Sequence, residues 1–498
     1  PPSRALFSAA IDTAAFSISN MFRPGNVALD IFGDKETSDA RRRCQPDPLD
    51  SEGQELFDLH LRVAIMYTLV YGGLMGTPFC RELVEPLMDS IGHPLSLVFD
   101  DADPSDDTPW GLAKTYFDEI DAWMTQNDGW NADGSANRDY NKIPFSDYAT
   151  TDSEGNSWTP YTPKNSPWKA RVIRWIMTPS DSTPARPICD EQLSKPKRWQ
   201  PLMDSNDLGY ISSQEHVTPY IGATARYFGF NSFKDEDAFA SRELDDPEYN
   251  YRHASVDVLE KTWLTAEDDF MQSAVVFFDN KFGSLVPLKI LYFLGVTDTM
   301  TALDFYRITV EVQLAIYNGL VLTWKEKVRH DLPRPPTVIA HKLGDEEFET
   351  YAGPGEGVQL IKASEWEPLI RTMPHSEFPS ASACICKVYA EQVVHFLGTD
   401  EIDPPIQTSP PLTAVPMEFS SWSEISETCA DSRVWGGMHF ADAAEAGGEL
   451  CGGGLLASSI SSSISALLDG DETAAVFKKD VGELMVRPLT PGSARKKN

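Results

Sequence analysis

Two cations, Lys327 and Arg334, stand seven positions apart where a long apolar pattern ends. Lys327 continues a series of apolar residues spaced by three and four, namely Leu303, Tyr306, Val310, Leu314, Tyr317, Val321 and Trp324. This spacing predicts one buried stripe on a long amphipathic helix, with the lysine as its next member. A buried lysine must meet an anion or lose its proton, whereas arginine keeps its charge. The two positions therefore favour a site for a multivalent anion.

The prolines around Arg334, in the run Leu332-Pro-Arg-Pro-Pro336, end this helix because proline removes backbone donors and restricts φ. The alternative for the same stretch is structural. Lys327 would then extend past the core to solvent, and Arg334 would pair with one of the 75 acidic residues of the chain.

Two later stretches also place polar groups at helix ends. In His375-Ser-Glu-Phe-Pro-Ser-Ala-Ser382, Pro379 and Ser380 are expected to begin a helix. Its first turn would present a hydroxyl and free N–H groups to an anion. In Ser432-Arg-Val-Trp-Gly-Gly-Met-His439, a third arginine precedes a histidine, and the glycine pair between them permits close backbone approach.

Together these stretches resemble the signature of the vanadium haloperoxidases and of their relatives, the class A acid phosphatases. That signature reads Lys-x6-Arg-Pro, then Pro-Ser-Gly-His, then Ser-Arg-x5-His. Six residues separate Lys327 from Arg334, 43 separate the Arg-Pro pair from Pro379, and five separate Arg433 from His439. The resemblance covers roughly residues 310–445.

The resemblance implies a mainly α-helical fold, a helical-bundle architecture with long ordered loops, and vanadate, vanadium(V), as cofactor. Hydrogen peroxide would oxidise a halide ion, bromide or chloride, and the product would halogenate an organic substrate. The implied vanadate-binding residues are Lys327, Arg334, Ser380, Ala381 through its N–H, Arg433 and His439. His439 would be the metal ligand, and Lys327 would also polarise the bound peroxide.

One departure from the signature concerns proton transfer. The Gly-His pair of the family is Ala381-Ser382 here, and a serine hydroxyl can relay a proton but cannot hold one near neutral pH. Some family members that halogenate terpenoid-like substrates also carry this serine. His375 is the expected replacement in proton transfer, or it lines a halide pocket with Trp324. The alternatives are a solvated loop histidine and a core tryptophan.

A second departure concerns the acid that orients the ligand histidine. The family usually places an aspartate four residues after it, where this chain has Ala443. Asp442, a backbone carbonyl or the distant Asp304 remain open for this role.

Two other functions remain open. An acid phosphatase would use His439 as a nucleophile, but its leaving alcohol needs a general acid, and Ser382 is a poor one. A non-catalytic relative would bind an oxyanion without turnover.

Composition limits the partners. The formal charge of −33 opposes binding to nucleic acid or to an anionic membrane surface, and no stretch of the sequence is a convincing membrane span. The same charge suits a soluble protein. The sequence begins at Pro1 without a methionine, which predicts a processed or trimmed form, so the compartment stays open, secretion included. A homo-oligomer such as a dimer also remains open.

Seven cysteines are too few for a disulfide scaffold, and the odd number leaves at least one unpaired within the chain. Cys384 and Cys386 form a C-x-C pair that could bind a metal with His395. Buried, packed thiols are the alternative.

Changes in texture along the chain predict its organisation. We expect a helical and loop-rich half over 1–260, a helical bundle with the oxyanion site over 261–486, and a tail over 487–498. Within the bundle we expect a Gly- and acid-rich connection, a Pro-rich loop and three helices. The connection covers Gly344–Pro374 and the Pro-rich loop covers Asp403–Pro416. The three helices are expected over Ser380–Leu397, from about Trp435, and within Gly452–Leu468.

Overall fold

The computed structural model describes the second half of the chain and a few earlier positions, and the described part is mostly helical. The described residues are 199, 202–205, 211–214, 250–279, 302–330, 332–408 and 415–468, with isolated positions between 86 and 292. Most of the half predicted over 1–260 and the whole of the tail predicted over 487–498 lie outside them. The predicted boundary between 260 and 261 falls inside helix α8 (Tyr251–Glu267), and the division into domains stays a prediction.

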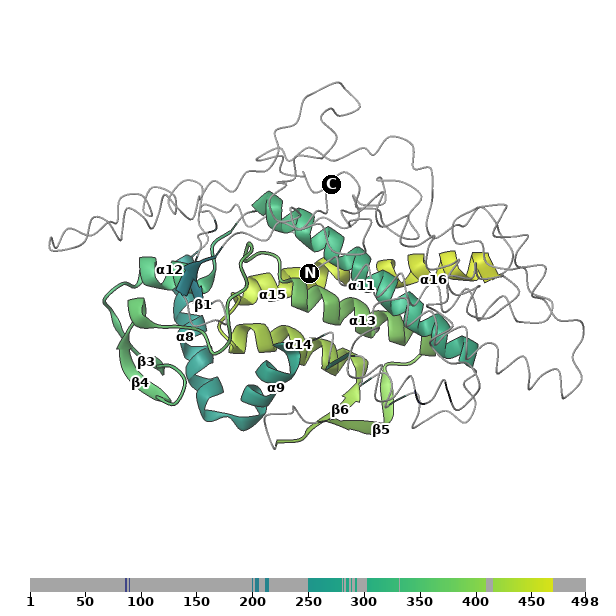
Figure 1. Cartoon of the computed structure of the whole chain (residues 1–498), viewed down its shortest axis with the longest axis horizontal. Coiled ribbons are helices and arrows are strands. Elements are labelled where there is room, and N and C mark those ends of the chain that lie inside the picture. Colours follow the sequence, from purple (N-terminus) through teal and green to yellow (C-terminus); the bar gives the residue numbers. More distant parts are fainter. Residues whose placement is uncertain are drawn as a thin grey trace, which may run out of the picture.

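The bundle is built around α13 (Ala381–Leu397), which packs against α11 (Ala302–His330), α14 (Trp422–Trp435), α15 (Ala441–Cys451) and α16 (Leu455–Leu468). Figure 1 shows α13, α14 and α15 side by side, with α11 crossing α13 and α16 following α15. The mainly α-helical architecture predicted from the sequence is confirmed. Helices predicted over Ser380–Leu397 and within Gly452–Leu468 are present as α13 and α16.

Helix α11 is buried on more than the predicted stripe. Of that stripe, Val310, Leu314, Tyr317, Val321 and Trp324 are buried as expected. Glu311, Asn318 and Thr323, on other faces, are buried as well, so the prediction of a single buried face was wrong. These polar side chains are hydrogen bonded: Glu311 accepts from Gln392 of α13 and Ser461 of α16, at 2.9 and 2.8 Å.

A second layer covers one end of the bundle. It contains α8, α9 (Asp269–Asp279), α12 (Pro335–Lys342) and an antiparallel hairpin of β3 (Glu347–Tyr351) and β4 (Val358–Lys362), paired from Glu347↔Lys362 to Tyr351↔Val358. Tyr251 and Leu259 of α8, Ile339 of α12, and Trp366 share a core with Phe440, which precedes α15. The short 3-10 helix η7 (Ala363–Glu365) leads from β4 into this core.

Two sequence expectations need correction. The region expected as a Pro-rich loop begins as strand β5 (Glu401–Thr408), which pairs with β6 (Met417–Ser421) across a register shift that accommodates its two prolines. Trp435 ends helix α14 instead of starting a helix. This helix begins after Ser421, whose hydroxyl accepts from the N–H of Glu424. A third hairpin, β1 (Met203–Ser205) with β2 (Ile211–Ser213), precedes the bundle in the chain.

The C-x-C pair does not form a metal site with His395, because each cysteine forms a disulfide with another helix. Cys384 of α13 is bonded to Cys451 of α15, and Cys386 is bonded to Cys429 of α14. The two disulfides therefore join α13 to α15 and to α14. Among the described residues no group of three or more His, Cys, Asp or Glu side chains could hold a metal ion.

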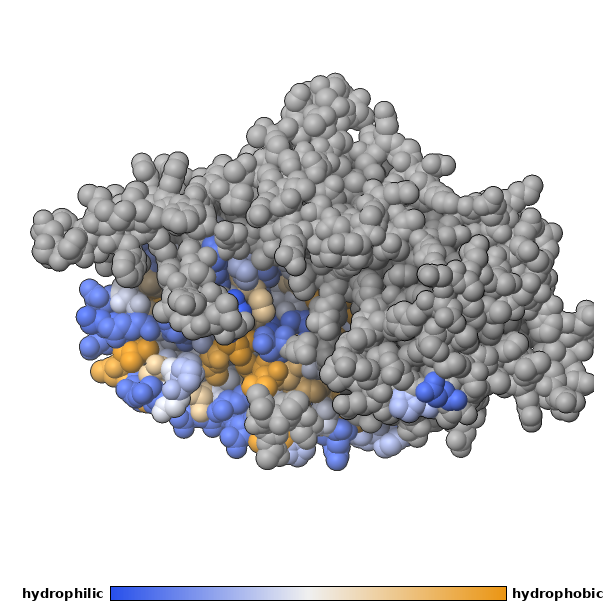
Figure 2. Space-filling view, viewed as in Figure 1, coloured by the Kyte–Doolittle hydropathy of each residue, from blue (hydrophilic) through white to orange (hydrophobic). Residues whose placement is uncertain are grey.

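The surface of the described part mixes polar and apolar residues. Figure 2 shows hydrophobic patches between hydrophilic residues where the β3–β4 hairpin, α8 and α9 lie. Leu360 of the hairpin, at 65% exposure, is the most exposed large hydrophobic residue of the described part. No helix in this part of the chain combines the length and apolarity needed to cross a membrane.

Helix α15 approaches the start of α13 through Gly447. A Cβ atom on Gly447 would overlap the carbonyl oxygen of Ser380, whereas a Cβ on the neighbouring Gly448 would meet nothing within 4 Å. The absence of a side chain at position 447 therefore allows α15 to lie against the first residues of α13.

We predict opposite effects for two neighbouring substitutions in α15. Gly447→Ala should lower the free energy of unfolding by about 1–3 kcal/mol, because the new methyl group must displace backbone. Gly448→Ala, the matched control, should raise it by up to about 1 kcal/mol through helix propensity. Denaturant unfolding of both variants checks this. Equal changes in the two variants would contradict the close contact.

Candidate active site

The residues singled out from the sequence meet where several helices begin or end. Lys327 lies near the end of α11, Arg334 is the N-cap of α12, and Ser380 is the N-cap of α13. Arg433 lies in the last turn of α14, and His439 precedes Phe440, the N-cap of α15. All five side chains are buried.

Arg334 links this cluster together. Its Nε donates to the carbonyl of His375 at 2.9 Å, and its Nη1 donates to the carbonyl of Met438 at 3.0 Å. Its Nη1 and Nη2 also lie 3.0 Å from His439 Nε2 and His375 Nδ1. Because guanidinium nitrogens only donate, both of these imidazole nitrogens accept. Burial lowers the pKa of Arg334 to about 10, and the nearby Glu377 opposes this shift.

Lys327 is fully buried and is held by main-chain oxygens. Its Nζ donates to the carbonyls of Ser376 and Glu377, at 2.8 and 3.1 Å. Burial, followed by the charge of Arg334, lowers the pKa of Lys327 well below its ordinary value, while the charge of Glu377 raises it. The first interpretation of the sequence is confirmed in part, because Lys327 stays inside the protein instead of extending to solvent.

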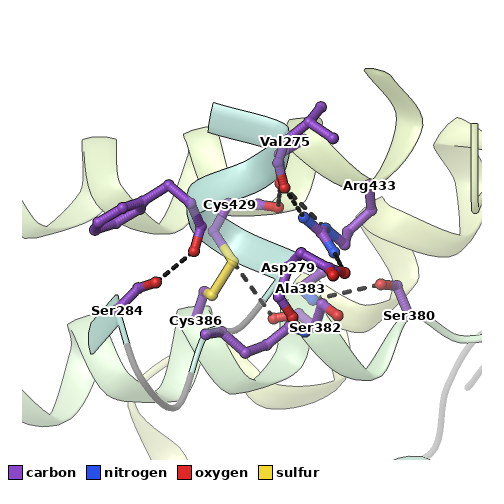
Figure 3. Close-up of a disulfide and its surroundings, with 12 residues drawn as sticks. Val275, Asp279, Ser284, Ser380, Ser382, Ala383, Cys386, Cys429 and Arg433 are labelled. Carbon is purple, nitrogen blue, oxygen red and sulfur yellow. Dashed lines mark hydrogen bonds and ion pairs between the residues drawn. A yellow bond between two sulfur atoms is a disulfide. The ribbon is translucent and has the colours of Figure 1, made fainter. Parts of the chain in front are cut away.

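Arg433 is held by α9. Its Nη2 donates to the carbonyl of Val275 at 3.2 Å, and its Nη1 lies 3.6 Å from Asp279 Oδ1, an ion-pair distance (Figure 3). This Nη1 has no hydrogen-bond partner in the part of the chain that the structure describes. Burial lowers the pKa of Arg433 to about 10, and Asp279 raises it.

His439 is oriented by an acid that the sequence analysis did not identify. Its Nδ1 lies 3.0 Å from Oε1 of Glu377, and the same oxygen accepts from the N–H of Phe440 at 3.1 Å. Asp304 cannot take this role, because it lies 23 residues before Lys327 on α11, about 34 Å along the helix axis. The Nδ1 contact is made by Glu377, whereas Asp442 begins the first turn of α15.

Burial dominates the protonation of this pair. It lowers the pKa of His439 well below its ordinary value, and the charges of Arg334 and Lys327 lower it further. Burial raises the pKa of Glu377 to about 7, although Arg334, Lys327 and the Phe440 N–H oppose the shift. His439 is therefore neutral near pH 7. The only sequence signal for Glu377 was its place in the stretch that begins at His375.

His375 and Trp324 lie together, with ring centroids 4.9 Å apart and planes inclined by 53°. Trp324 is buried, and His375 is partly exposed beside the nitrogen of Arg334 that it accepts from. The predicted proximity of these two residues to each other and to the cations is therefore present.

The start of α13 has the predicted form. Ser380 caps the helix by accepting from the N–H of Ala383 at 3.4 Å, and its own N–H donates to the carbonyl of Ala443 at 2.8 Å. Ala381 and Ser382 form the first turn, whose N–H groups have no partner within a helix. Figure 3 shows Ser380 and Ser382 on the same side of the disulfide as Arg433.

The residues present fit vanadate on two observations. Lys327, Arg334 and Arg433 all lie close enough to His439 for their charges to lower its pKa. Lys327 and Arg334 face a single buried carboxylate, that of Glu377, so an added oxyanion would offset the remaining positive charge. Nη1 of Arg433, which has no hydrogen-bond partner in the described part of the chain, supplies a donor for an oxygen. Nε2 of His439 supplies a lone pair for the metal.

Comparison with known proteins identifies this class of fold. Residues 307–465 match the family model of the VCPO second helical-bundle domain. This match agrees with the family that the motifs predicted, and it spans every residue of the predicted site. A comparison of the sequence with curated proteins finds no match.

Three solved structures share the fold. An apo-type bacterial vanadium-dependent chloroperoxidase is 18% identical with a TM-score of 0.69, and the match covers 94% of each chain. The holo-type structure of a bacterial vanadium-dependent chloroperoxidase is 18% identical with a TM-score of 0.67, covering 93% of this chain and 92% of that one. A bacterial vanadium-dependent iodoperoxidase is 17% identical with a TM-score of 0.54, covering 93% and 91%.

We predict that Arg334→Ala and Arg433→Ala each weaken the binding of vanadate and of phosphate by roughly 2–5 kcal/mol, the usual cost of breaking a buried charge interaction. Isothermal titration calorimetry with each anion measures this. The matched control is Arg252→Ala, because Arg252 of α8 forms an exposed ion pair with Glu346, and its removal should leave both affinities unchanged. Unchanged affinities in Arg334→Ala and Arg433→Ala would place the anion site elsewhere.

Proposed function

We propose that the protein is a vanadium-dependent haloperoxidase, which uses hydrogen peroxide to oxidise bromide or chloride and to halogenate an organic substrate. The observation that carries the proposal is the convergence of three buried cations with the accepting Nε2 of His439 at the start of α13. The fold supports it, because the three solved structures compared above are described as vanadium-dependent peroxidases.

The chain's own residues would bind and orient the oxyanion. Lys327, Arg334 and Arg433 would neutralise its charge, and Ser380 with the N–H of Ala381 would add hydrogen bonds. His439 would offer Nε2 as the only protein ligand to the metal. When bound, vanadate supplies Lewis acidity that activates hydrogen peroxide toward a halide. The overall reaction turns halide, peroxide and one proton into hypohalous acid and water.

The proton needed by this reaction would be handled at the exposed side of the site. His375 accepts from Arg334 and is partly exposed, so its imidazole can exchange protons with solvent. Ser382 would relay a proton. Trp324, packed against His375, would form with it one wall of the halide pocket.

The two other functions differ in what they predict. A phosphatase would use His439 to attack phosphorus and would need a general acid for the leaving alcohol. A non-catalytic relative would bind the oxyanion and turn nothing over. Halide oxidation in the presence of vanadate separates both of these from the proposed haloperoxidase.

We also propose that the protein matures in an oxidising compartment, which would agree with secretion. Two disulfides join α13 to α14 and α15, and structural disulfides form mainly in such compartments. The partners would be hydrogen peroxide, a halide ion and an organic substrate, and a homodimer stays a prediction.

We predict that the protein binds vanadate and then brominates a phenolic dye with peroxide and bromide. His439→Ala should abolish stable vanadate binding and turnover while leaving the helical circular dichroism unchanged, since it removes the one metal ligand. His395→Ala is the control, because His395 lies 15 residues beyond Ser380, about 22 Å along α13. Hydrolysis of p-nitrophenyl phosphate without dye bromination would favour a phosphatase. Stoichiometric vanadium and full turnover in His439→Ala would disprove the ligand assignment.

We predict that His375→Ala lowers turnover more than Ser382→Ala, because a hydroxyl that only relays a proton can be replaced by water. A histidine-like ionisation in the pH–rate profile should disappear in His375→Ala and persist in Ser382→Ala. Bromide should be oxidised more readily than chloride, since it loses electrons more easily. The measurement is a pH–rate profile of the three proteins with each halide. An inactive Ser382→Ala beside an unchanged His375→Ala would transfer the proton role to the serine.

A further inference from the structure

Glu377 is a buried acid in the loop between η7 and α13, and both its main chain and its side chain are hydrogen bonded. Its backbone N–H donates to the carbonyl of Leu332 at 3.0 Å, and its own carbonyl accepts from Lys327 Nζ at 3.1 Å. Its carboxylate contacts His439 and accepts from the N–H of Phe440. The carboxylate is therefore aimed at one nitrogen of one ring, with its main chain fixed independently of that contact.

The hydrogen bonds around His439 determine which ring nitrogen carries the proton. Oε1 of Glu377 is an acceptor, because it receives the N–H of Phe440. At the other side of the ring, Nε2 faces Nη1 of Arg334, which can only donate. A neutral His439 therefore carries its proton on Nδ1 and donates it to Glu377, and its lone pair on Nε2 points toward the cations.

We propose that Glu377 is the positioning residue for the metal ligand of this site: it holds the Nδ1 proton of His439, fixes the ring and makes Nε2 a stronger donor to vanadium. This inference rests on the proposed function, because the role of Nε2 as a ligand does. Carboxylates that hold the second nitrogen of a ligand histidine act in this way in other metal sites.

The surroundings of position 443 explain why the acid comes from another part of the chain. Ala443 is fully buried in an apolar cluster with Leu332, Phe378 and Ala446. Its carbonyl accepts from the N–H of Ser380, which brings the start of α15 against the start of α13. A carboxylate at position 443 would have to enter this apolar contact without a partner, at a high desolvation cost. Glu377 reaches the ring from the loop side and also faces Lys327 and Arg334.

A matched control for Glu377 exists elsewhere in the same bundle. Glu391 of α13 also accepts from two backbone groups, the N–H of Gly453 at 2.9 Å and that of Gly454 at 2.7 Å, between α15 and α16. It contacts no histidine in these interactions. Its Oε1 also lies 3.6 Å from Lys387 Nζ, so Glu391→Gln reports the effect of removing a carboxylate that holds main chain and one lysine.

The test uses nitrogen-15-labelled histidine in the full-length protein, first without vanadate, with the His439 signals assigned from His439→Ala. In the wild type we expect a protonated Nδ1, whose proton is shifted downfield, and an unprotonated Nε2. The downfield shift should shrink in Glu377→Gln, whose amide oxygen accepts without charge. In Glu377→Leu the signal of the Nδ1 proton should disappear, because without its acceptor the proton exchanges with water. The spectrum of Glu391→Gln should match that of the wild type.

Vanadate affinity, measured by calorimetry, provides the second measurement. It should fall by roughly 10–100-fold in Glu377→Leu and by less in Glu377→Gln, and it should be unchanged in Glu391→Gln. If Glu377→Leu does not fold, as judged by circular dichroism, the spectrum and the affinity of Glu377→Gln decide alone.

Two results would overturn the inference: a proton on Nε2 in the wild type, or wild-type spectra and affinity in the Glu377 variants. Either can occur while the wild type brominates the dye, so the proposed function would survive. If the spectra follow the prediction but vanadate-loaded protein oxidises no halide, the positioning role stands and the haloperoxidase function fails.

Discussion

The described part of this protein depends on burying three like charges together. Lys327, Arg334 and Arg433 are all buried and have lost their contact with water. The chain has a formal charge of −33, but this net negative charge does not replace the lost hydration of the three side chains. Burial of an unpaired charge costs several kcal/mol, and like charges close together add to that cost. The lowered pKa values of all three side chains express this constraint.

Main-chain oxygens supply most of the compensation. Lys327 donates to two carbonyls of the loop before α13, Arg334 to the carbonyls of His375 and Met438, and Arg433 to that of Val275. These carbonyls are available because helices end or loops turn at the same place. That arrangement in turn needs α13 held closely to its neighbours, which the two disulfides and the contact at Gly447 provide. The remaining positive charge favours a bound anion.

The guanidinium of Arg334 also determines which ring nitrogens of His439 and His375 can carry a proton. Arg334 donates to both His439 and His375, so neither nitrogen that faces it can carry a proton without placing two donors against each other. His439 is also held by Glu377 and is buried, whereas His375 is partly exposed. The difference in exposure separates a ring suited to binding a metal from a ring suited to exchanging protons.

The sequence by itself determined those parts of the site that depend on local spacing. Lys327 and Arg334 follow from helical periodicity and the prolines, Ser380 follows from N-cap chemistry, and Arg433 and His439 follow from a motif across one helix end. Helix positions in the bundle were predictable where apolar spacing was regular, as for α13. They were not predictable for α14, whose buried serines, threonine and arginine interrupt that spacing. Only the tertiary structure decided which cysteines pair and which acid meets His439, because these contacts join residues 43 to 67 positions apart. The role of Glu377 could not be predicted for the same reason. A carboxylate orients an imidazole ring through its position in space, and a single sequence shows only which residues are adjacent to it along the chain.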